Sequence, residues 1–94
     1  MTTIEWAKEW AEDHEEEILL ADGFEDAFVG VAQIFNEFVA VYDMAKCLGI
    51  LMTRDGMTYE EADEYFTFNV TGAYVGKRTP AFLIRPPEDA DAAG

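Results

Sequence analysis

Residues 27–42 read AFVGVAQIFNEFVAVY, and this stretch decides the predicted fold. Its two halves, 27–35 and 38–42, are rich in β-branched and aromatic side chains, which favour strands. They flank the short polar pair Asn36-Glu37, so the pattern predicts a β-hairpin. A helix over 24–35 is the alternative, because four apolar side chains also recur at helical spacing: Phe24, Phe28, Val31 and Phe35.

The chain before the hairpin predicts one long amphipathic helix over residues 3–21. Apolar side chains recur on one face at three- and four-residue steps, and acidic side chains fill the other face. Thr2 and Glu5 have the spacing of a capping box, and Gly23 is expected to end the helix. The only histidine, His14, is expected to pack on the apolar face.

Two further helices and a strand are predicted after the hairpin. Asp43 is expected to cap a helix that ends in the turn 54–56. Thr58 and Glu61 have the spacing of a second capping box. The helix that they open is expected to bury Ala62, Phe66, Val70 and Ala73 and to end at Gly72 and Gly76. A last strand over 81–84 is expected to begin at Pro80, where a missing N–H does least harm.

This order of elements predicts a single α+β domain over residues 1–87. It comprises an N-terminal acidic helix, a β-hairpin, two helices and a C-terminal strand that completes a small antiparallel sheet. A chain of 94 residues has room for one core and not for two lobes. Residues 88–94 form an acidic tail of small side chains, which we expect to be disordered.

The residues present predict a protein that is not an enzyme and that has no cofactor and no metal site. Cys47 and His14 are the only residues of their kinds, and they lie on separate predicted helices. Cys47 is expected to be an inert buried thiol. Four-ligand zinc sites are excluded by count. A calcium loop centred on Gly56 would place Leu51 and Ala62 where acidic ligands are needed.

Charge is the strongest functional signal in the sequence. The chain has 20 acidic and 6 basic residues, a net charge of -14, and residues 1–26 alone hold ten acidic residues and one lysine. Repulsion excludes direct binding to nucleic acid or to an anionic membrane, so the expected partner is a basic protein. We expect its contact surface to imitate backbone phosphates with seven carboxylates: Glu9, Glu12, Asp13, Glu16, Asp22, Glu25 and Asp26.

Two alternatives to a phosphate mimic remain open. Acidic side chains also serve solubility, although Glu15-Glu16-Glu17 would oppose the dipole of the predicted helix. A small scaffolding protein could instead form a homodimer through aromatic side chains, namely Trp6, Trp10, Tyr65 or Tyr74. The chain start lacks the pattern of a signal peptide, and no apolar run approaches the ~18 to 20 residues of a membrane span. We therefore expect a cytoplasmic location.

Several short stretches carry a resemblance to a protein group. They are residues 21–24, 39–43, 47–52, 54–62 (RDGMTYEEA), 65–76 (YFTFNVTGAYVG) and Thr79-Pro80. On these residues the chain resembles a group of small, mostly uncharacterised proteins encoded by bacteriophages and prophages. The resemblance covers about two thirds of the chain, from Asp22 to Leu83. It brings no catalytic residues, and most of the predicted first helix lies outside it.

The resemblance implies a phage genome and expression in the cytoplasm of a bacterial host. Small acidic phage proteins include inhibitors of host defence of the anti-CRISPR, anti-restriction and uracil-DNA glycosylase inhibitor types. Many of these present carboxylates in place of phosphates. By this analogy, the expected function is inhibition of a host defence nucleoprotein.

Overall fold

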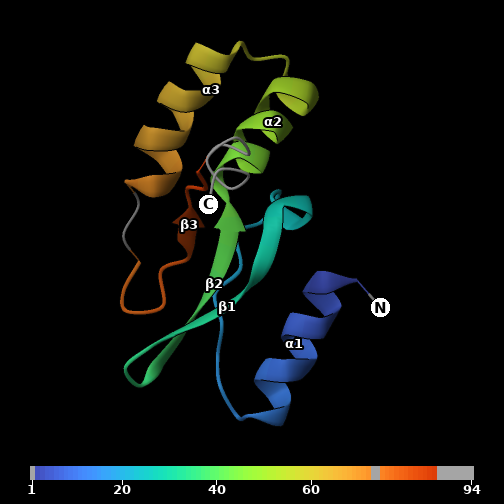
Figure 1. Cartoon of the computed structure of the whole chain (residues 1–94), viewed down its shortest axis with the longest axis vertical. Coiled ribbons are helices and arrows are strands. Elements are labelled where there is room, and N and C mark those ends of the chain that lie inside the picture. Colours follow the sequence, from blue (N-terminus) through green and yellow to red (C-terminus); the bar gives the residue numbers. More distant parts are fainter. Residues whose placement is uncertain (1, 73–74, 87–94) are drawn as a thin grey trace.

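The computed structural model describes residues 2–72 and 75–86 and has the predicted α+β architecture (Figure 1). Its elements in chain order are helix α1 (Thr3–Asp13), a 3₁₀ turn (Glu25–Ala27), strands β1 (Phe28–Ile34) and β2 (Glu37–Asp43), helices α2 (Met44–Asp55) and α3 (Tyr59–Phe66), a π-helical turn (Thr67–Thr71) and strand β3 (Ala81–Leu83). The predicted tail, residues 88–94, lies outside the described residues.

The hairpin prediction is confirmed, and the alternative of a helix over 24–35 is wrong. β1 and β2 pair antiparallel, and Ile34 pairs with Glu37. The turn is therefore Phe35-Asn36, one residue earlier than predicted. A bulge at Val29 shifts the register between Phe28 and Gly30. Strand structure prevails because β-branched and aromatic side chains from both halves of this stretch pack across the pair.

The prediction of an antiparallel sheet is wrong for its third strand. The sheet order is β1-β2-β3, and β3 runs parallel to β2, with Val41 opposite Ala81 and Asp43 opposite Leu83. The reason is the connection between the two strands. The segment that contains α2 and α3 leaves from the end of β2 and returns alongside it, so β3 enters the sheet in the same direction as β2. Such a crossover joins parallel neighbours. The sheet is therefore mixed.

The first helix is shorter than predicted: α1 ends at Asp13, and Gly23 is not its stop. Glu15 has a left-handed backbone, with φ of 54°. The Glu16 N–H donates to Ala11 O at 2.8 Å, and the Glu15 N–H donates to Glu12 O at 3.1 Å. This is the hydrogen-bond pattern of a Schellman motif. Three successive glutamates at a helix C-terminus repel each other and oppose the dipole, so continuing the helix is disfavoured.

The caps of the two C-terminal helices are as predicted. Asp43 Oδ1 accepts from the Lys46 N–H at 3.0 Å, and Gly56 ends α2 with φ of 69°. Thr58 and Glu61 form a reciprocal capping box. However, α3 ends at Phe66 and continues only as the π-helical turn. Of the predicted buried residues beyond Phe66, Val70 is half-buried, and Ala73 lies outside the described residues.

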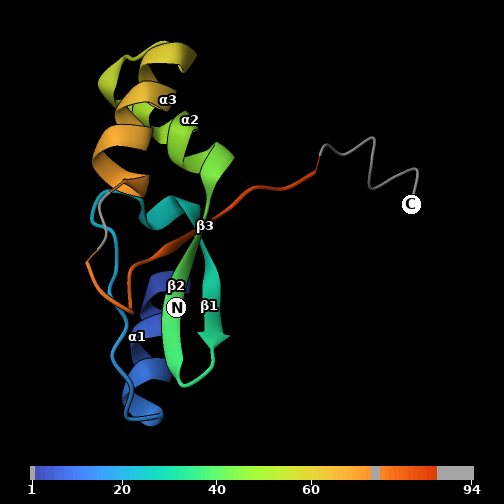
Figure 2. The ribbon, with the colours of Figure 1, turned by 90° about the vertical axis from the view of Figure 1, so that its left-hand side faces the viewer.

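The core lies between the helices and one face of the sheet. α1 and α3 are on the same side of the sheet but toward its two ends (Figures 1 and 2). The ring of Phe66 on α3 meets Phe24 at 5.8 Å and Phe82 at 4.9 Å, both edge to face. Tyr42 on β2 is fully buried. Aromatic packing thus ties together segments that lie up to 58 residues apart.

Candidate functional site

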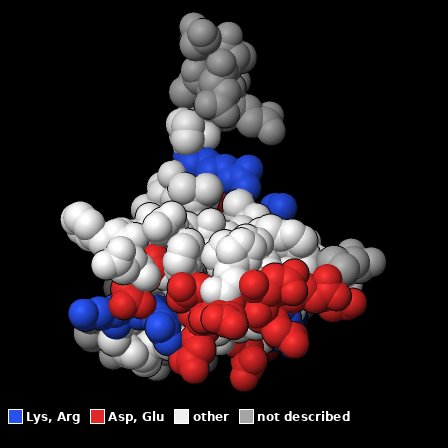
Figure 3. Space-filling view, turned by 90° about the horizontal axis from the view of Figure 1, so that it is seen from below, with Lys and Arg blue, Asp and Glu red and all other residues white. Residues whose placement is uncertain are grey.

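The acidic surface begins on the outer side of α1. Ala7 and Ala11 are buried and face the core, whereas Glu9, Glu12 and Asp13 are exposed. The helical repeat therefore places these carboxylates outward, as the sequence predicts. Figure 3 shows Asp and Glu side chains gathered in a band across the end of the molecule that carries α1.

Glu16 is more buried than the predicted contact residues on α1. It is half-buried and, with Glu12, lines a hollow of about 270 Å³ between α1 and the extended segment that follows it. Lys8 lines the same hollow. Because α1 ends at Asp13, Glu16 lies beyond the helix, in the segment that closes this hollow.

Glu17, next to the surface, has a partner that is distant in the sequence. Arg78 donates to Glu17 Oε2 at 2.8 Å and to Glu37 Oε2 at 3.2 Å. One arginine therefore joins the glutamate run to the start of β2. Glu17 is therefore ion-paired although its side chain is 84% exposed, whereas its acidic neighbours on α1 have no ion-pair partner among the described residues.

A second group of carboxylates lies in the turn before β1. Glu25 and Asp26 are exposed and line a hollow with Thr2, Thr3, Ile4 and Phe28, at the N-terminal end of α1. Glu25 Oε1 accepts from the Gly23 N–H at 3.2 Å. Hydrogen bonds from the backbone N–H groups of Glu25 itself and of Gly23 hold the pKa of this carboxyl below its usual range. Glu25 is therefore ionised at neutral pH.

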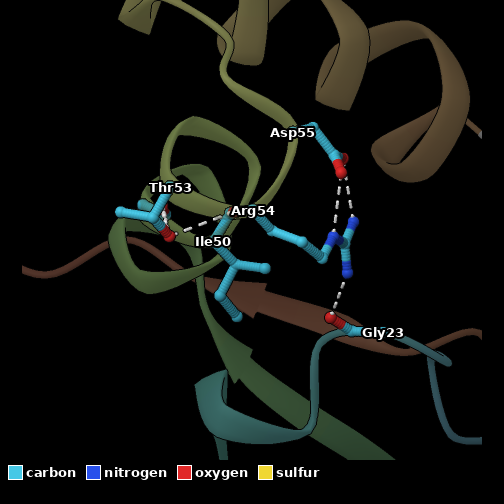
Figure 4. Close-up of polar contacts among 6 residues, drawn as sticks. Gly23, Ile50, Thr53, Arg54 and Asp55 are labelled. Carbon is cyan, nitrogen blue, oxygen red and sulfur yellow. Dashed lines mark hydrogen bonds and ion pairs between the residues drawn. The ribbon is translucent and has the colours of Figure 1, made fainter.

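Arg54, at the end of α2, holds this turn in place (Figure 4). Its Nη1 donates to Gly23 O at 2.9 Å, and its Nε and Nη2 donate to the two carboxylate oxygens of Asp55, each at 3.1 Å. The guanidinium also lies 5.7 Å from the centre of the Phe24 ring. Gly23 has φ of 92°, and a Cβ there would lie 2.9 Å from Arg54 Nη1. Glycine is thus required at the turn and not at a helix end.

The seven predicted residues do not form one cluster. Glu12 and Glu16 lie toward the C-terminal end of α1, whereas Glu25 and Asp26 lie at its N-terminal end. Asp22 lines a separate, mainly apolar hollow with Phe24 and Phe82. Within residues 2–72 and 75–86, none of the seven forms an ion pair. The arrangement is carboxylates without ion-pair partners on α1 and at its two ends, with Asp22 apart from them.

The aromatic residues considered for a homodimer differ in their exposure. Trp10 stacks on His14, with ring centres 4.2 Å apart, and meets Phe38 edge to face at 5.1 Å. His14 thus packs against an aromatic residue of the apolar face, as predicted, but it is exposed at the helix end. Trp6 and Tyr65 are each 43% exposed. Tyr74 lies outside the described residues.

A reactive thiol and a metal site are the two other kinds of chemistry that the described residues are expected to lack. Cys47 is buried, as predicted, and burial raises its pKa to about 11. Its thiol is therefore protonated at neutral pH and a poor nucleophile. Across the part of the chain that the structure describes, no group of three or more His, Cys, Asp or Glu residues is arranged to hold a metal ion.

Sequence reasoning missed the two arginines that organise the acidic surface. Arg78 reaches partners 41 and 61 residues away, and Arg54 reaches Gly23 across 31 residues. Neither periodicity nor a local motif predicts contacts between residues this far apart in the sequence. The adjacency of Lys77 and Arg78, the only neighbouring basic pair, was the one available signal.

Comparisons with protein-family models, with curated proteins and with solved structures find no match to this chain. Among the described residues, no helix combines the length and the apolar character needed to cross a membrane.

Proposed function

We propose that this protein is a non-enzymatic phage inhibitor of a host defence nucleoprotein, of the anti-CRISPR or anti-restriction type. It binds a basic nucleic-acid-binding surface through the carboxylates along α1. The observation that carries the proposal is the set of acidic residues on α1 and at its two ends, all exposed except the half-buried Glu16, that lack an ion-pair partner within the described residues. These charges repel each other in the free protein, and a basic partner would relieve that repulsion.

Phosphate mimicry needs fixed negative charge more than any reactive group. Glu9, Glu12 and Asp13 project from a regular helix, and Arg54 fixes the turn that carries Glu25 and Asp26. Because the backbone that carries these carboxylates is already ordered, binding costs the rotamer freedom of the side chains but no ordering of the chain, which favours affinity. The summed field also accelerates encounter with a basic partner.

The alternative function is a small scaffolding protein that forms a homodimer through aromatic side chains. The exposure of Trp6 and Tyr65, 43% for each residue, supports it. Trp10 supports it less, because its ring is already packed against His14 and Phe38. In this alternative the acidic residues serve solubility only.

The experiment uses two variants with the same change in charge. Glu12→Gln/Asp13→Asn removes two carboxylates from α1, and Glu60→Gln/Asp63→Asn removes two from α3. A partner is first captured from a bacterial host lysate with the wild-type protein, and association is then measured by surface plasmon resonance at two salt concentrations. We expect only the α1 variant to associate several-fold more slowly. We also expect wild-type binding to weaken with salt, as the Debye length falls from ~10 Å at 0.1 M to ~3 Å at 1 M.

Competition with nucleic acid separates mimicry from general charge attraction. The captured partner should lose its bound DNA or RNA when the protein is added, as followed by gel mobility shift. Equal association rates for the two variants, or an undisturbed nucleic-acid complex, would count against the proposal. Sedimentation equilibrium of the free protein tests the alternative, which requires a stable dimer.

A further inference from the structure

A shallow, open depression of about 280 Å³ runs along α3 and the π-helical turn that follows it, far from the acidic surface on α1. It is lined by Glu61, Glu64, Tyr65, Phe68 and Asn69. These residues are spaced three and four apart, so they form one stripe along the helix and its π-helical extension. Two carboxylates and two aromatic rings therefore line one open depression on this surface of the helix.

The aromatic part of this site faces solvent and consists of Tyr65, near the end of α3, and Phe68, in the π-helical turn. Phe68 is 75% exposed and Tyr65 is 43% exposed, and neither ring packs against another ring among the described residues. The turn closes through the Gly72 N–H, which donates to Thr67 O at 3.1 Å; a Cβ at Gly72 would lie only 2.9 Å from that oxygen. Turns of this type occur frequently at functional sites. Burial in the core does not explain a phenylalanine at position 68.

The acidic part of the site consists of Glu61, which is fixed by the capping box, and Glu64, which has no ion-pair partner among the described residues. Glu61 Oε1 accepts from the Thr58 N–H at 2.9 Å, which fixes the side chain as part of the capping box. This hydrogen bond and the one with the Thr58 side chain hold the pKa of Glu61 below its usual range. Glu64 is exposed, and neither glutamate forms an ion pair within residues 2–72 and 75–86.

The chemistry of the lining selects the ligand. We propose that this depression binds an arginine side chain of a partner protein. A guanidinium group is a planar cation that stacks on aromatic faces and donates hydrogen bonds to carboxylates at its edge. The Asn69 side chain donates to Tyr65 O at 3.1 Å, which leaves its amide oxygen as a further acceptor. None of the chain's own described lysines or arginines lines the depression.

The site is independent of the acidic surface in space. α3 and α1 lie toward opposite ends of the molecule in both ribbon views (Figures 1 and 2). Arginine binding at α3 therefore does not depend on the proposed mimicry at α1. Neutralising carboxylates on α1 tests one proposal and leaves the other intact.

The test uses three model peptides, acetyl-Gly-X-Gly-amide with X as arginine, lysine or citrulline. Citrulline has the shape of arginine without its charge. Each peptide is titrated into the ¹⁵N-labelled protein, and amide chemical shifts are followed by NMR. We expect the arginine peptide to shift the signals of residues 61–69, the lysine peptide to bind more weakly and the citrulline peptide to leave them unchanged.

Matched variants assign the effect to the depression. Phe68→Leu keeps the apolar bulk but removes the ring, and it should weaken binding of the arginine peptide about three- to fivefold. Glu64→Gln should weaken it, whereas Glu60→Gln, which makes the same charge change outside the depression, should not. Thermal melting verifies that each variant folds. Equal binding of the arginine and lysine peptides, equal effects of the two glutamate variants, or shifts spread over all acidic residues would each overturn the proposal.

Discussion

Glu15 lies just beyond the end of α1 and has a left-handed backbone conformation that glycine usually adopts. Its φ of 54° costs a residue with a Cβ roughly 1–2 kcal/mol, and the hydrogen bonds of the Schellman motif offset that cost. The side chain is exposed and extends the acidic run. A residue that stability alone disfavours at this position lies beside the proposed binding surface.

We predict that Glu15→Gly raises the free energy of unfolding by about 1 kcal/mol, because glycine relieves the left-handed strain. Urea unfolding followed by circular dichroism measures the change. Glu15→Ala is the control, because it removes the charge but retains the Cβ. Stabilisation of the same size in both variants would show that charge repulsion, and not backbone strain, is the cost at this position.

Cys47 gives the fold a dependence on alkaline pH. Its pKa is about 11 in the folded protein and about 9 in the unfolded chain, so the unfolded chain loses its thiol proton first. The contribution of the protonated Cys47 thiol to the free energy of unfolding is therefore complete below pH 9, and it is lost as the pH rises toward 11. We predict that wild type loses more unfolding free energy between pH 8 and 10.5 than Cys47→Ala does. Urea titrations at the two pH values measure this difference, and parallel losses would contradict the prediction.

At the scale of elements, the capping box at Thr58 sets where α3 begins. Thr58 Oγ1 accepts from the Glu61 N–H at 3.2 Å, and Glu61 Oε1 accepts from the Thr58 N–H at 2.9 Å. The helix that follows has eight residues, too few to be stable on its own. Its cap and the burial of Ala62 and Phe66 therefore decide whether it forms.

We predict that Thr58→Ala lowers the free energy of unfolding by about 1 kcal/mol, the usual value of an N-cap. Thr58→Ser retains the hydroxyl and should remain close to wild type. Both are measured by urea unfolding. If Ser were as destabilising as Ala, the contribution of Thr58 would come from its methyl group and not from the cap.

At the scale of the whole molecule, the net charge of -14 opposes folding. The described chain offsets part of this charge through four ion pairs, two of which share Arg78. The carboxylates on α1 have no such partner among the described residues. Self-repulsion is therefore concentrated at the end of the molecule that carries α1 (Figure 3).

We predict that the melting temperature rises when NaCl is increased from 0.02 to 0.5 M, because salt screens repulsion among exposed carboxylates. Glu12→Gln/Asp13→Asn should melt higher than wild type at low salt and should show a smaller response to salt. Circular dichroism melting curves at several salt concentrations measure both effects. A melting temperature that falls with salt would show that attractive ion pairs dominate the surface.

The sequence by itself determined the features that depend on neighbouring residues. The hairpin follows from β-branched and aromatic residues on either side of a short turn, and the Asp43 cap and the Thr58–Glu61 box follow from fixed local spacing. The outward position of Glu9, Glu12 and Asp13 follows from the helical repeat. Such features depend only on residues that are close in the sequence, so composition and periodicity are enough to predict them.

Only the tertiary structure decided the features that depend on contacts between distant segments. The parallel pairing of β3 with β2 depends on how α2 and α3 return the chain, and the turn at Gly23 depends on Arg54, 31 residues away. The end of α1 depends on the competition between an amphipathic pattern and the repulsion of three glutamates, which the pattern alone does not weigh. Residue spacing places Tyr65 and Phe68 on one stripe, but only the folded chain shows that both remain exposed beside Glu64.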